Sequence, residues 1–414
     1  MARRIAIVGG GYAGLLCAVR LARKTREEDA QIVLFTELPY FVERIRLHED
    51  AAGLVRRRRP LRELLGGARV EVRVGRVHGA DLAGRRLLVD ARPCGVENRA
   101  RAKEAFDDLV LATGSIASRP HIPGIERAFA CANEDDVLAL RAELDAKPRA
   151  RVVVVGGGLT GIELASELGE RRPDLAITLV TGDEVGPMVT GTGRAHVRAV
   201  LAKLGVALRE HERVAACEEG AVVLASGETL ASDVVVWAGG FEASPLARAL
   251  DLEVDELGRA FVDRRLRSRS HPFVRVIGDA ARVAIPTHAD NVPSLLRMAC
   301  ATAVPQGAFA ADALAAEIHR SEDPEAAFSF GYAGRCVSLG RKNGIIQLAD
   351  AWDLPHERWI GGRAAALVKE AVCRYPLASV RLERWGFAYR WPKAPPLERA
   401  RVRGALTGGA NGSM

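Results

Sequence analysis

The sequence lacks the cysteine patterns that accompany disulfide frameworks and zinc sites. Its seven cysteines stand at positions 17, 94, 131, 217, 300, 336 and 373, and no two of them have CxxC or CxxxxC spacing. Because the number is odd and the spacings are irregular, neither a disulfide scaffold nor a metal site is expected. This cysteine usage is typical of a protein in a reducing cytoplasm.

Long apolar runs are also missing. The stretch at residues 5–19 follows Arg3 and Arg4 and resembles a secretion signal at first sight, but a glycine-rich fingerprint within it explains it better. No other run approaches the roughly 18 apolar residues that a membrane span requires. We therefore expect no membrane-spanning helix.

The formal net charge is +7, but the chain has no long block of charge of one sign. Arginines are spread along the whole chain, and the one dense run, Arg56–Arg59, lies between small residues and Pro60. We interpret this run as a solvated turn, in preference to a site for an anionic partner, and expect no nucleic-acid binding. With 414 residues, 48% hydrophobic and 27% charged, the chain suits two or three globular domains.

Glycine, in contrast, occurs in a repeated pattern. A GxGxxG motif follows an expected strand at residues 4–8 and opens an expected helix at residues 13–24, and it recurs 147 residues later, after an expected strand at residues 151–155. In such a motif the first glycine permits a tight turn, the second lets the backbone approach a pyrophosphate, and the third lets helix and strand pack closely. The pyrophosphate lies at the helix N-terminus, so two copies predict two bound dinucleotides. The glycines are Gly9, Gly11, Gly14, Gly156, Gly158 and Gly161.

A carboxylate at the end of the second strand of such a unit usually binds the adenine ribose. The first unit has Thr36 there with Glu37 one residue beyond, and the second has Thr181 with Asp183 two residues beyond. Glu37 still suits a ribose diol. The missing carboxylate at Thr181 removes repulsion toward a 2′-phosphate, but no arginine lies beside it and the next along the chain is Arg194. The choice between NADH and NADPH stays open.

Four motifs together resemble those of a known superfamily. In chain order they are Gly9–Gly14, Leu111-Ala112-Thr113-Gly114, Gly156–Gly161 and Gly278-Asp279. This order is similar to that of the two-dinucleotide-binding flavoproteins of the pyridine-nucleotide-disulfide oxidoreductase type, over about residues 4–320. The resemblance implies FAD in the first domain and NAD(P)H in the second. It also implies that Asp279 binds the FAD ribityl chain or pyrophosphate and that Thr113 and Gly114 line FAD.

The resemblance implies an α/β fold with two Rossmann-like three-layer dinucleotide-binding domains and a smaller C-terminal α+β domain. We expect a discontinuous FAD-binding domain at residues 1–120 and 241–322, an NAD(P)H-binding domain at 121–240, and a C-terminal interface or acceptor domain at 323–414. Besides the glycines, Thr36, Glu37 and Thr181, further cofactor contacts are expected at Tyr12, Ala13, Arg44, Ala112, Thr160, Gly240 and Gly278.

Within the superfamily, cysteine positions separate the branches. Residues 39–44 contain no cysteine, whereas peroxide and coenzyme A disulfide reductases carry one there. Sulfide:quinone reductases carry a cysteine at the start of the second glycine-rich helix, where this chain has Ile162 and Glu163. The chain therefore looks most like the type II NADH dehydrogenase group, which implies Glu163 near the flavin–nicotinamide stack. Thr302 and Gln306 stand where this group has two quinone-pocket glutamines, and Pro305 is expected to bend or start that helix.

These observations favour an FAD-dependent NAD(P)H oxidoreductase that passes hydride to FAD and electrons to a quinone or another small organic acceptor, without a redox-active disulfide. The alternatives are a biosynthetic flavin dehydrogenase or oxidase and a non-catalytic FAD-bearing redox sensor. His288, Gln306, Arg341 and Lys342 are candidates for the acceptor side, with the last two expected in a solvent-exposed turn. Peripheral contact with the inner face of the membrane and an oligomeric state are both left open.

The C-terminal part has patterns of its own. Residues 336–339 and 345–348 flank a glycine-containing turn and indicate a β-hairpin, and helices are expected at about residues 294–317 and 362–373. Trp385, Phe387, Tyr389 and Trp391 alternate with other residues, which indicates a strand that packs against the core or, alternatively, contacts a membrane or covers a substrate. The last ~12 residues are expected to be mobile.

Overall fold

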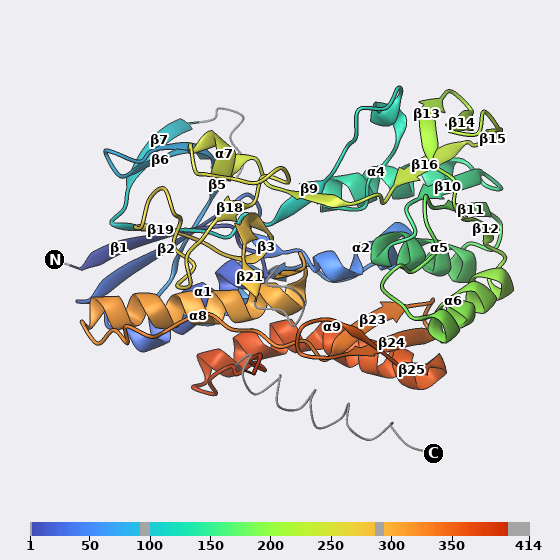
Figure 1. Ribbon diagram of the computed structural model, residues 1–414. Helices are drawn as coiled ribbons and strands as arrows, with labels where there is room; N and C mark the ends of the chain where they lie inside the picture. The colour runs from blue at the N-terminus through green and yellow to red at the C-terminus, as the bar shows by residue number, and fades with distance from the viewer. Residues whose placement is uncertain (1, 92–99, 286–293, 396–414) are drawn as a thin grey trace, which may run out of the picture.

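The computed structural model describes residues 2–91, 100–285 and 294–395, which form two sheet-centred units and a C-terminal unit lying along both (Figure 1). The expected α/β fold, with two dinucleotide-binding units and a smaller C-terminal unit, is confirmed. His288 and the terminal residues expected to be mobile lie outside the described part of the chain.

The first unit is built on a seven-stranded sheet whose strands come from distant parts of the chain. Because β19 pairs with β8, the chain returns to the first sheet after building the second unit. The strands from β19 to β5 run parallel, and β6 and β7 continue the sheet antiparallel. The order is β19 (Val274–Val276), β8 (Asp108–Leu111), β1 (Arg3–Val8), β2 (Ala30–Thr36), β5 (Glu71–Asp81), β6 (Arg86–Ala91) and β7 (Ala100–Ala105).

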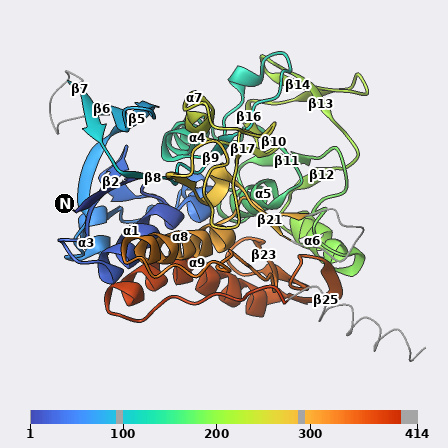
Figure 2. The ribbon, with the colours of Figure 1, turned by 60° about the vertical axis from the view of Figure 1, so that its left-hand side comes forward.

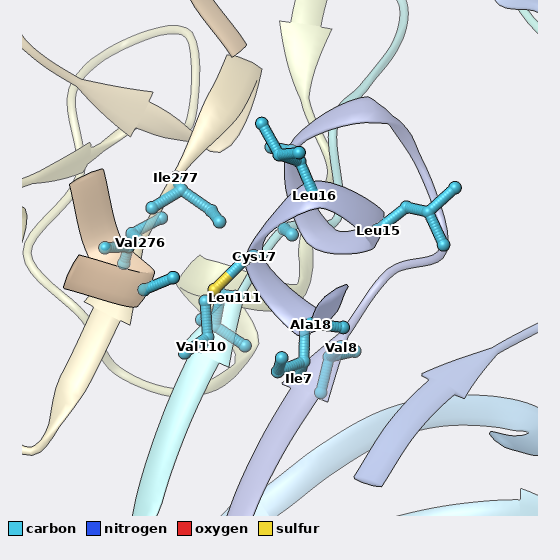
Figure 3. Close-up of a cluster of buried hydrophobic side chains, with 14 of the residues drawn as sticks. Ile7, Val8, Leu15, Leu16, Cys17, Ala18, Val110, Leu111, Val276 and Ile277 are labelled. Atoms are coloured by element: carbon cyan, nitrogen blue, oxygen red, sulfur yellow. The ribbon is translucent and has the colours of Figure 1, made fainter. Parts of the chain in front are cut away.

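Helix α1 (Tyr12–Lys24) lies on this sheet and is itself covered by α8 (Cys300–Ile318). Figure 3 shows side chains of α1 meeting those of β1, β8 and β19, and Leu16, Cys17, Val110 and Val276 are all fully buried there. Burial raises the pKa of the Cys17 thiol to about 12. Cys17 therefore acts as a small apolar core residue.

The second unit has a four-stranded parallel sheet with valine-rich central strands, which suits a sheet covered on both faces. Its order is β12 (Ala207–Arg209), β11 (Ala176–Val180), β10 (Arg151–Val155) and β16 (Val234–Trp237). Three helices belong to it, namely α4 (Glu134–Ala146), α5 (Leu159–Arg171) and α6 (Gly191–Lys203). A small antiparallel sheet adds β13 (Val214–Glu218), β14 (Ala221–Leu224) and β15 (Thr229–Ala231). Where the chain passes between the units, β9 (Ser115–Ala117) pairs with β17 (Phe241–Ala243).

Short elements complete the two units. They are β3 (Tyr40–Phe41), α2 (Leu47–Ala51), β4 (Arg59–Pro60), α3 (Leu61–Leu65), α7 (Leu246–Ala249), β18 (Ala260–Phe261), β20 (Ala281–Arg282), β21 (Ala284–Ile285) and β22 (Ser294–Leu295). Of these, α2 matters most for the site, because it packs against both α4 and α5.

The C-terminal unit consists of three antiparallel strands and one long helix. The strands are β23 (Gly334–Ser338), β24 (Gly344–Ala349) and β25 (Pro355–Gly361), and pairing of β23 with β24 confirms the expected hairpin. Helix α9 (Gly362–Arg384) is longer than expected and packs against α1, α8 and the hairpin, as Figure 2 shows. Within the described residues, no helix combines the length and apolarity needed to cross a bilayer.

The strand expected at the alternating aromatic residues is wrong. Residues 385–391 follow α9 as irregular chain, with Trp385 and Phe387 exposed and Tyr389 and Trp391 packed against the core. The indole N–H of Trp391 donates to the Ser329 carbonyl at 2.8 Å. The alternation therefore does not mark a buried face: only Tyr389 and Trp391 pack, and they do so in a loop without a partner strand.

Two further expectations need correction. The helix expected from residue 294 begins at Cys300, because residues 294–295 form β22 and pair with β21. The arginine run is only partly a solvated turn. Arg57 is exposed, but Arg56 and Arg58 bind the carboxylate of Asp50 on α2, at 3.0 and 3.4 Å.

Candidate functional site

The first glycine motif forms a tight turn with one open side. Gly9 has φ +115°, and an ideal Cβ on it would lie 2.3 Å from the Ala112 carbonyl oxygen. A Cβ on Gly14 would lie 2.0 Å from the Gly9 carbonyl oxygen, whereas one on Gly11 would meet nothing within 4 Å. The outer glycines are therefore required by packing, and the middle one leaves open space at the start of α1.

The second motif repeats this geometry. Gly156 has φ +124° and would place a Cβ 2.5 Å from the Ala238 carbonyl oxygen, and Gly161 would place one 1.9 Å from the Gly156 carbonyl oxygen. A Cβ on Gly158 again meets nothing within 4 Å.

Both turns fit a dinucleotide pyrophosphate. Gly11 and Gly158 are the N-cap residues of α1 and α5, and neither helix has a side-chain cap or an acidic residue in its first turn. Their first N–H groups are thus available to an anion, which the helix dipole also favours. Ala13 and Thr160 lie in these first turns. We call the two turns the first and second cradle.

Polar side chains gather beside the first cradle, where β19 ends. The Ser115 hydroxyl donates to Asp279 Oδ2 at 2.7 Å, and burial raises the pKa of Asp279 despite this bond and the charge of Arg44. Arg44 donates to the Ala132 carbonyl at 3.0 Å, and burial lowers its pKa. An ideal Cβ on Gly114 would lie 3.1 Å from Arg44. The structure thus brings together three residues expected to contact FAD, namely Arg44, Gly114 and Asp279. It adds Ser115, which sequence analysis missed.

Two further polar groups of this region have no partner. The Tyr12 hydroxyl and Thr113 Oγ1 are buried and form no hydrogen bond within the described residues. Ala112, beside Thr113, donates its N–H to the Val8 carbonyl, and Gly278 adopts φ +70° before Asp279. Buried polar groups without partners are rare in proteins, and a polar ligand is one way to satisfy them.

Glu163 lies in a buried ionic cluster where the units meet. Its Oε1 accepts hydrogen bonds from the Ser338 N–H at 2.9 Å and from Lys369 Nζ at 2.8 Å, and its Oε2 lies 3.8 Å from His48 Nδ1. Burial would raise the pKa of Glu163, but Lys369 and His48 hold it below its usual value. Burial lowers the pKa of His48 to about 4. We call Glu163, Lys369, His48 and the neighbouring Glu167 the junction cluster.

Glu167 lies one helical turn after Glu163 and is fully buried. Neither carboxylate oxygen has a hydrogen-bond partner within the described residues, and burial raises the pKa of Glu167 to about 7. Sequence analysis found Glu163 through its motif but missed His48, Glu167 and Lys369, because nothing in the local sequence connects them.

Comparisons with known proteins agree with this geometry. Residues 3–306 match the family described as pyridine nucleotide-disulphide oxidoreductase. The chain belongs to this family. An NADH dehydrogenase-like protein of Mycobacterium tuberculosis is 33% identical over 333 residues, covering 74% of this chain and 78% of that protein. A type II NADH:quinone oxidoreductase of Staphylococcus epidermidis is 26% identical over 403 residues, covering 89% of this chain and 94% of that protein.

Solved structures of the same fold are known. NDH2 of Plasmodium falciparum in complex with NADH matches with a TM-score of 0.75 at 14% identity, over 94% of this chain and 99% of that one. Reduced CoADR-RHD of Bacillus anthracis matches with a TM-score of 0.71 at 25% identity, over 84% of this chain but only 62% of that one. As a member of the pyridine nucleotide-disulphide oxidoreductase family, the chain is an oxidoreductase whose cofactors are FAD and NAD(P)H.

Within the described residues, four cysteines are buried and two, Cys300 and Cys336, are partly buried. Six cysteines are described and all are free. Three of them surround Lys369, whose Nζ donates to the Cys336 carbonyl at 3.3 Å. Burial raises the pKa of Cys336 and Cys373, and that of Cys300 to about 12. A high pKa leaves little of the reactive thiolate at neutral pH.

The residues expected at a quinone pocket are engaged within the protein. The Thr302 hydroxyl lies 2.7 Å from the Arg297 carbonyl, and Gln306 Oε1 accepts the Gly278 N–H at 2.9 Å. Both side chains are buried, and Pro305 lies inside α8 and does not start it. Gln306 therefore supports the turn that carries Asp279.

A cavity of about 300 Å³ lies between the β23–β24 hairpin and α9. Lys369 and Cys373 lie on its wall, and Lys342 and Arg363 also line it. Arg341 and Lys342 are exposed at the hairpin turn, as expected, and Arg341 also pairs with Glu49 at 3.0 Å and with Glu370 at 3.2 Å. Glu37 is exposed beyond β2, and Gly240, with φ +138°, follows β16.

Proposed function

We propose that the chain is an FAD-dependent NAD(P)H oxidoreductase that delivers electrons to a quinone-like acceptor without a redox-active disulfide. The observation that carries the proposal is the duplicated cradle, because two turns of the same geometry suit two dinucleotides. FAD is assigned to the first cradle and NAD(P)H to the second. When bound, FAD supplies a ring that accepts hydride and passes electrons on.

The residues of the first cradle hold and orient FAD. The N–H groups at the start of α1 bind its pyrophosphate, and Gly11 gives the backbone the necessary approach. Asp279, held by Ser115, accepts hydrogen bonds from the ribityl chain or pyrophosphate region. The Gln306 amide fixes the turn before Asp279.

The junction cluster keeps a fixed charge pair beside the second cradle. Glu163 follows the last glycine of that cradle by two residues, and Lys369 and the Ser338 N–H hold its carboxylate in one position. We assign Glu163 to the nicotinamide side of the stack, where a fixed carboxylate contributes to alignment of the reacting atoms.

A small organic acceptor suits this chain better than a disulfide. The raised pKa values of Cys300, Cys336 and Cys373 disfavour thiolate attack. The relative from Staphylococcus epidermidis is named a type II NADH:quinone oxidoreductase. The cavity beside α9 offers space for such a molecule.

The outer face of α9 supports an acceptor that resides in a bilayer. From Val368 onward, the exposed apolar side chains of α9 and of its C-cap residue recur at intervals of four, three, seven and three residues, and Leu367 precedes Val368, so they lie on one broad face. They are Leu367, Val368, Val372, Tyr375, Leu382 and Trp385. Arg363, Arg374 and Arg381 are exposed beside this face, whereas both acids of α9, Glu370 and Glu383, are paired. A helix of this kind binds at the surface of an anionic membrane. We therefore propose peripheral contact through α9.

Stopped-flow mixing tests the proposal. The flavin-loaded protein is mixed anaerobically with NADH or NADPH, and then with a soluble quinone or with a small disulfide. We expect rapid flavin bleaching, rapid reoxidation by the quinone and slow reoxidation by the disulfide. The Cys300→Ser, Cys336→Ser and Cys373→Ser triple variant should reoxidise like the parent. Absence of bleaching with either coenzyme contradicts the proposal, and loss of quinone reduction in the triple variant contradicts its thiol-free route.

A further inference from the structure

The two cradles hold their strand ends in the same way. An ideal Cβ on Gly10 would lie 2.8 Å from Thr36 Oγ1, and one on Gly157 would lie 2.5 Å from Thr181 Oγ1. Thr36 is the last residue of β2 and Thr181 directly follows β11, and each hydroxyl lies beside the second residue of its glycine turn, Gly10 or Gly157. In such units the residues at this strand end contact the adenine ribose.

The charge that follows each threonine differs between the units. In the first unit the next residue is Glu37, whose carboxylate lies 3.7 Å from Arg76 on the neighbouring strand β5. In the second unit the next residue is Gly182, and an ideal Cβ on it would lie 3.1 Å from Cγ and 3.4 Å from Cζ of Arg213. Both strand ends therefore have an arginine beside them, but only the first has the carboxylate that pairs with it.

Arg213 is available to an anion. It is exposed, and no carboxylate pairs with it in the part of the chain that the structure describes. The neighbouring arginines are occupied: Arg194 and Arg198 bind Glu184, Arg198 also binds Glu210, and Arg209 binds Glu212 and Glu228. These arginines in turn neutralise the nearby glutamates. Asp183 is the remaining acid at this turn and His211 the remaining exposed base.

We propose that Arg213 binds the 2′-phosphate of NADPH and gives the second cradle a preference for NADPH over NADH. The inference rests on the proposed function, because it requires NAD(P)H at this cradle. A carboxylate accepts hydrogen bonds from a ribose diol and repels a phosphate, whereas a guanidinium binds a phosphate through paired N–H···O bonds. Thr181 and Gly182 supply no carboxylate, and Arg213 supplies the guanidinium from a loop 31 residues further along the chain.

Binding of two nucleotide fragments tests the proposal without any redox step. The flavin-loaded protein is titrated with 2′,5′-ADP, which carries the 2′-phosphate, and with 5′-AMP, which lacks it. We expect the parent to bind 2′,5′-ADP at least about tenfold more tightly, and Arg213→Gln to weaken that binding about 10- to 100-fold while 5′-AMP binding stays unchanged. Arg141→Gln, which makes the same charge change on α4, should alter neither. Equal affinity of the parent for both fragments, or equal losses for both in Arg213→Gln, overturns the proposal.

A reverse variant gives the second unit the carboxylate that the first unit has at Glu37. Gly182 has no left-handed φ, and the contact its new Cβ would make is with a flexible side chain, so Gly182→Glu is compatible with the fold. It should pair with Arg213 as Glu37 does with Arg76 and reverse the preference toward 5′-AMP. Asp183→Asn, which removes the opposing charge, should tighten binding of 2′,5′-ADP.

Flavin bleaching separates the two proposals. If neither coenzyme bleaches the flavin, the proposed function fails. If NADH bleaches it at low concentration, NADPH does so only at much higher concentration, and Arg213→Gln changes neither, then only the NADPH preference fails.

Discussion

The junction cluster contains two buried groups whose effects on stability oppose each other over one pH range. The pKa of His48 falls from 6.5 to about 4 on folding, so an unfolded chain binds this proton first and stability is lost as the pH falls from about 6.5 to 4. The pKa of Glu167 rises from 4.5 to about 7, so stability is lost as the pH rises from about 4.5 to 7. Each shift corresponds to about 3 kcal/mol over its full range.

Between about pH 4.5 and 6.5, the opposite effects of His48 and Glu167 on the free energy of unfolding cancel. The parent should therefore show little pH dependence of stability from this cluster. The charges that face the pair are Glu163, Lys369, Arg56 and Arg341, with Glu49 3.9 Å from His48 Nε2 and with Glu170 and Arg171 on the same helix as Glu167. Because lysine and arginine stay charged throughout this range and the pKa of Glu163 is held low, they add no comparable slope.

Glu167→Gln removes the contribution of Glu167 to the pH dependence of stability and leaves that of His48. On acidification from pH 6.5 to 4.5, this variant should lose about 3 kcal/mol more than the parent, or roughly 3–4 °C in melting temperature. His48→Gln should show the opposite trend and become less stable as the pH rises toward 7. Scanning fluorimetry of the flavin-loaded proteins measures this stability difference. The control is Glu143→Gln on α4, because Glu143 pairs with Lys147 and lies outside the junction cluster. Parallel pH profiles for the parent and both junction variants would refute the reasoning.

Three other outcomes are expected. Gly11→Val should abolish FAD retention, read as the ratio of flavin to protein absorbance, because a side chain would fill the open space of the first cradle; a fully yellow variant contradicts that assignment. Arg20→Met should lower the free energy of unfolding by about 3–5 kcal/mol, because it removes one of the ion-pair partners of the fully buried Glu383. Trp385→Ser changes an exposed side chain and should alter the free energy of unfolding by no more than about 0.5 kcal/mol. Leu367→Glu should weaken sedimentation with phosphatidylglycerol vesicles, and equal sedimentation of the variant and the parent would count against the α9 face.

The local part of the site could be predicted from the sequence. Each glycine motif is contiguous with the strand and helix it joins, so spacing alone locates both cradles, and the hairpin near residue 340 is likewise local. Contacts between distant segments could not be predicted. The partners of Glu163 come from positions 48, 338 and 369, and Arg213 reaches Gly182 from another loop. The aromatic alternation was misleading because Trp385 and Phe387 are exposed, whereas Tyr389 and Trp391 pack from a loop in which Trp391 donates to the Ser329 carbonyl.

Helix α9 connects the two cradle helices directly. Near its C-terminus, Glu383 pairs with Arg20 on α1 at 3.1 Å, and near its middle, Lys369 pairs with Glu163 on α5 at 2.8 Å. The two residues are 14 positions apart, which corresponds to about 21 Å along a helix. Both contacts are buried ion pairs, which are strongly destabilising to break. Helix α9, which contains Pro376 between the two contacts, therefore links the start of α5 to the middle of α1. Two rings that exchange hydride must approach to about 3–3.5 Å, so we expect the C-terminal unit to contribute to that alignment even though it carries neither cradle.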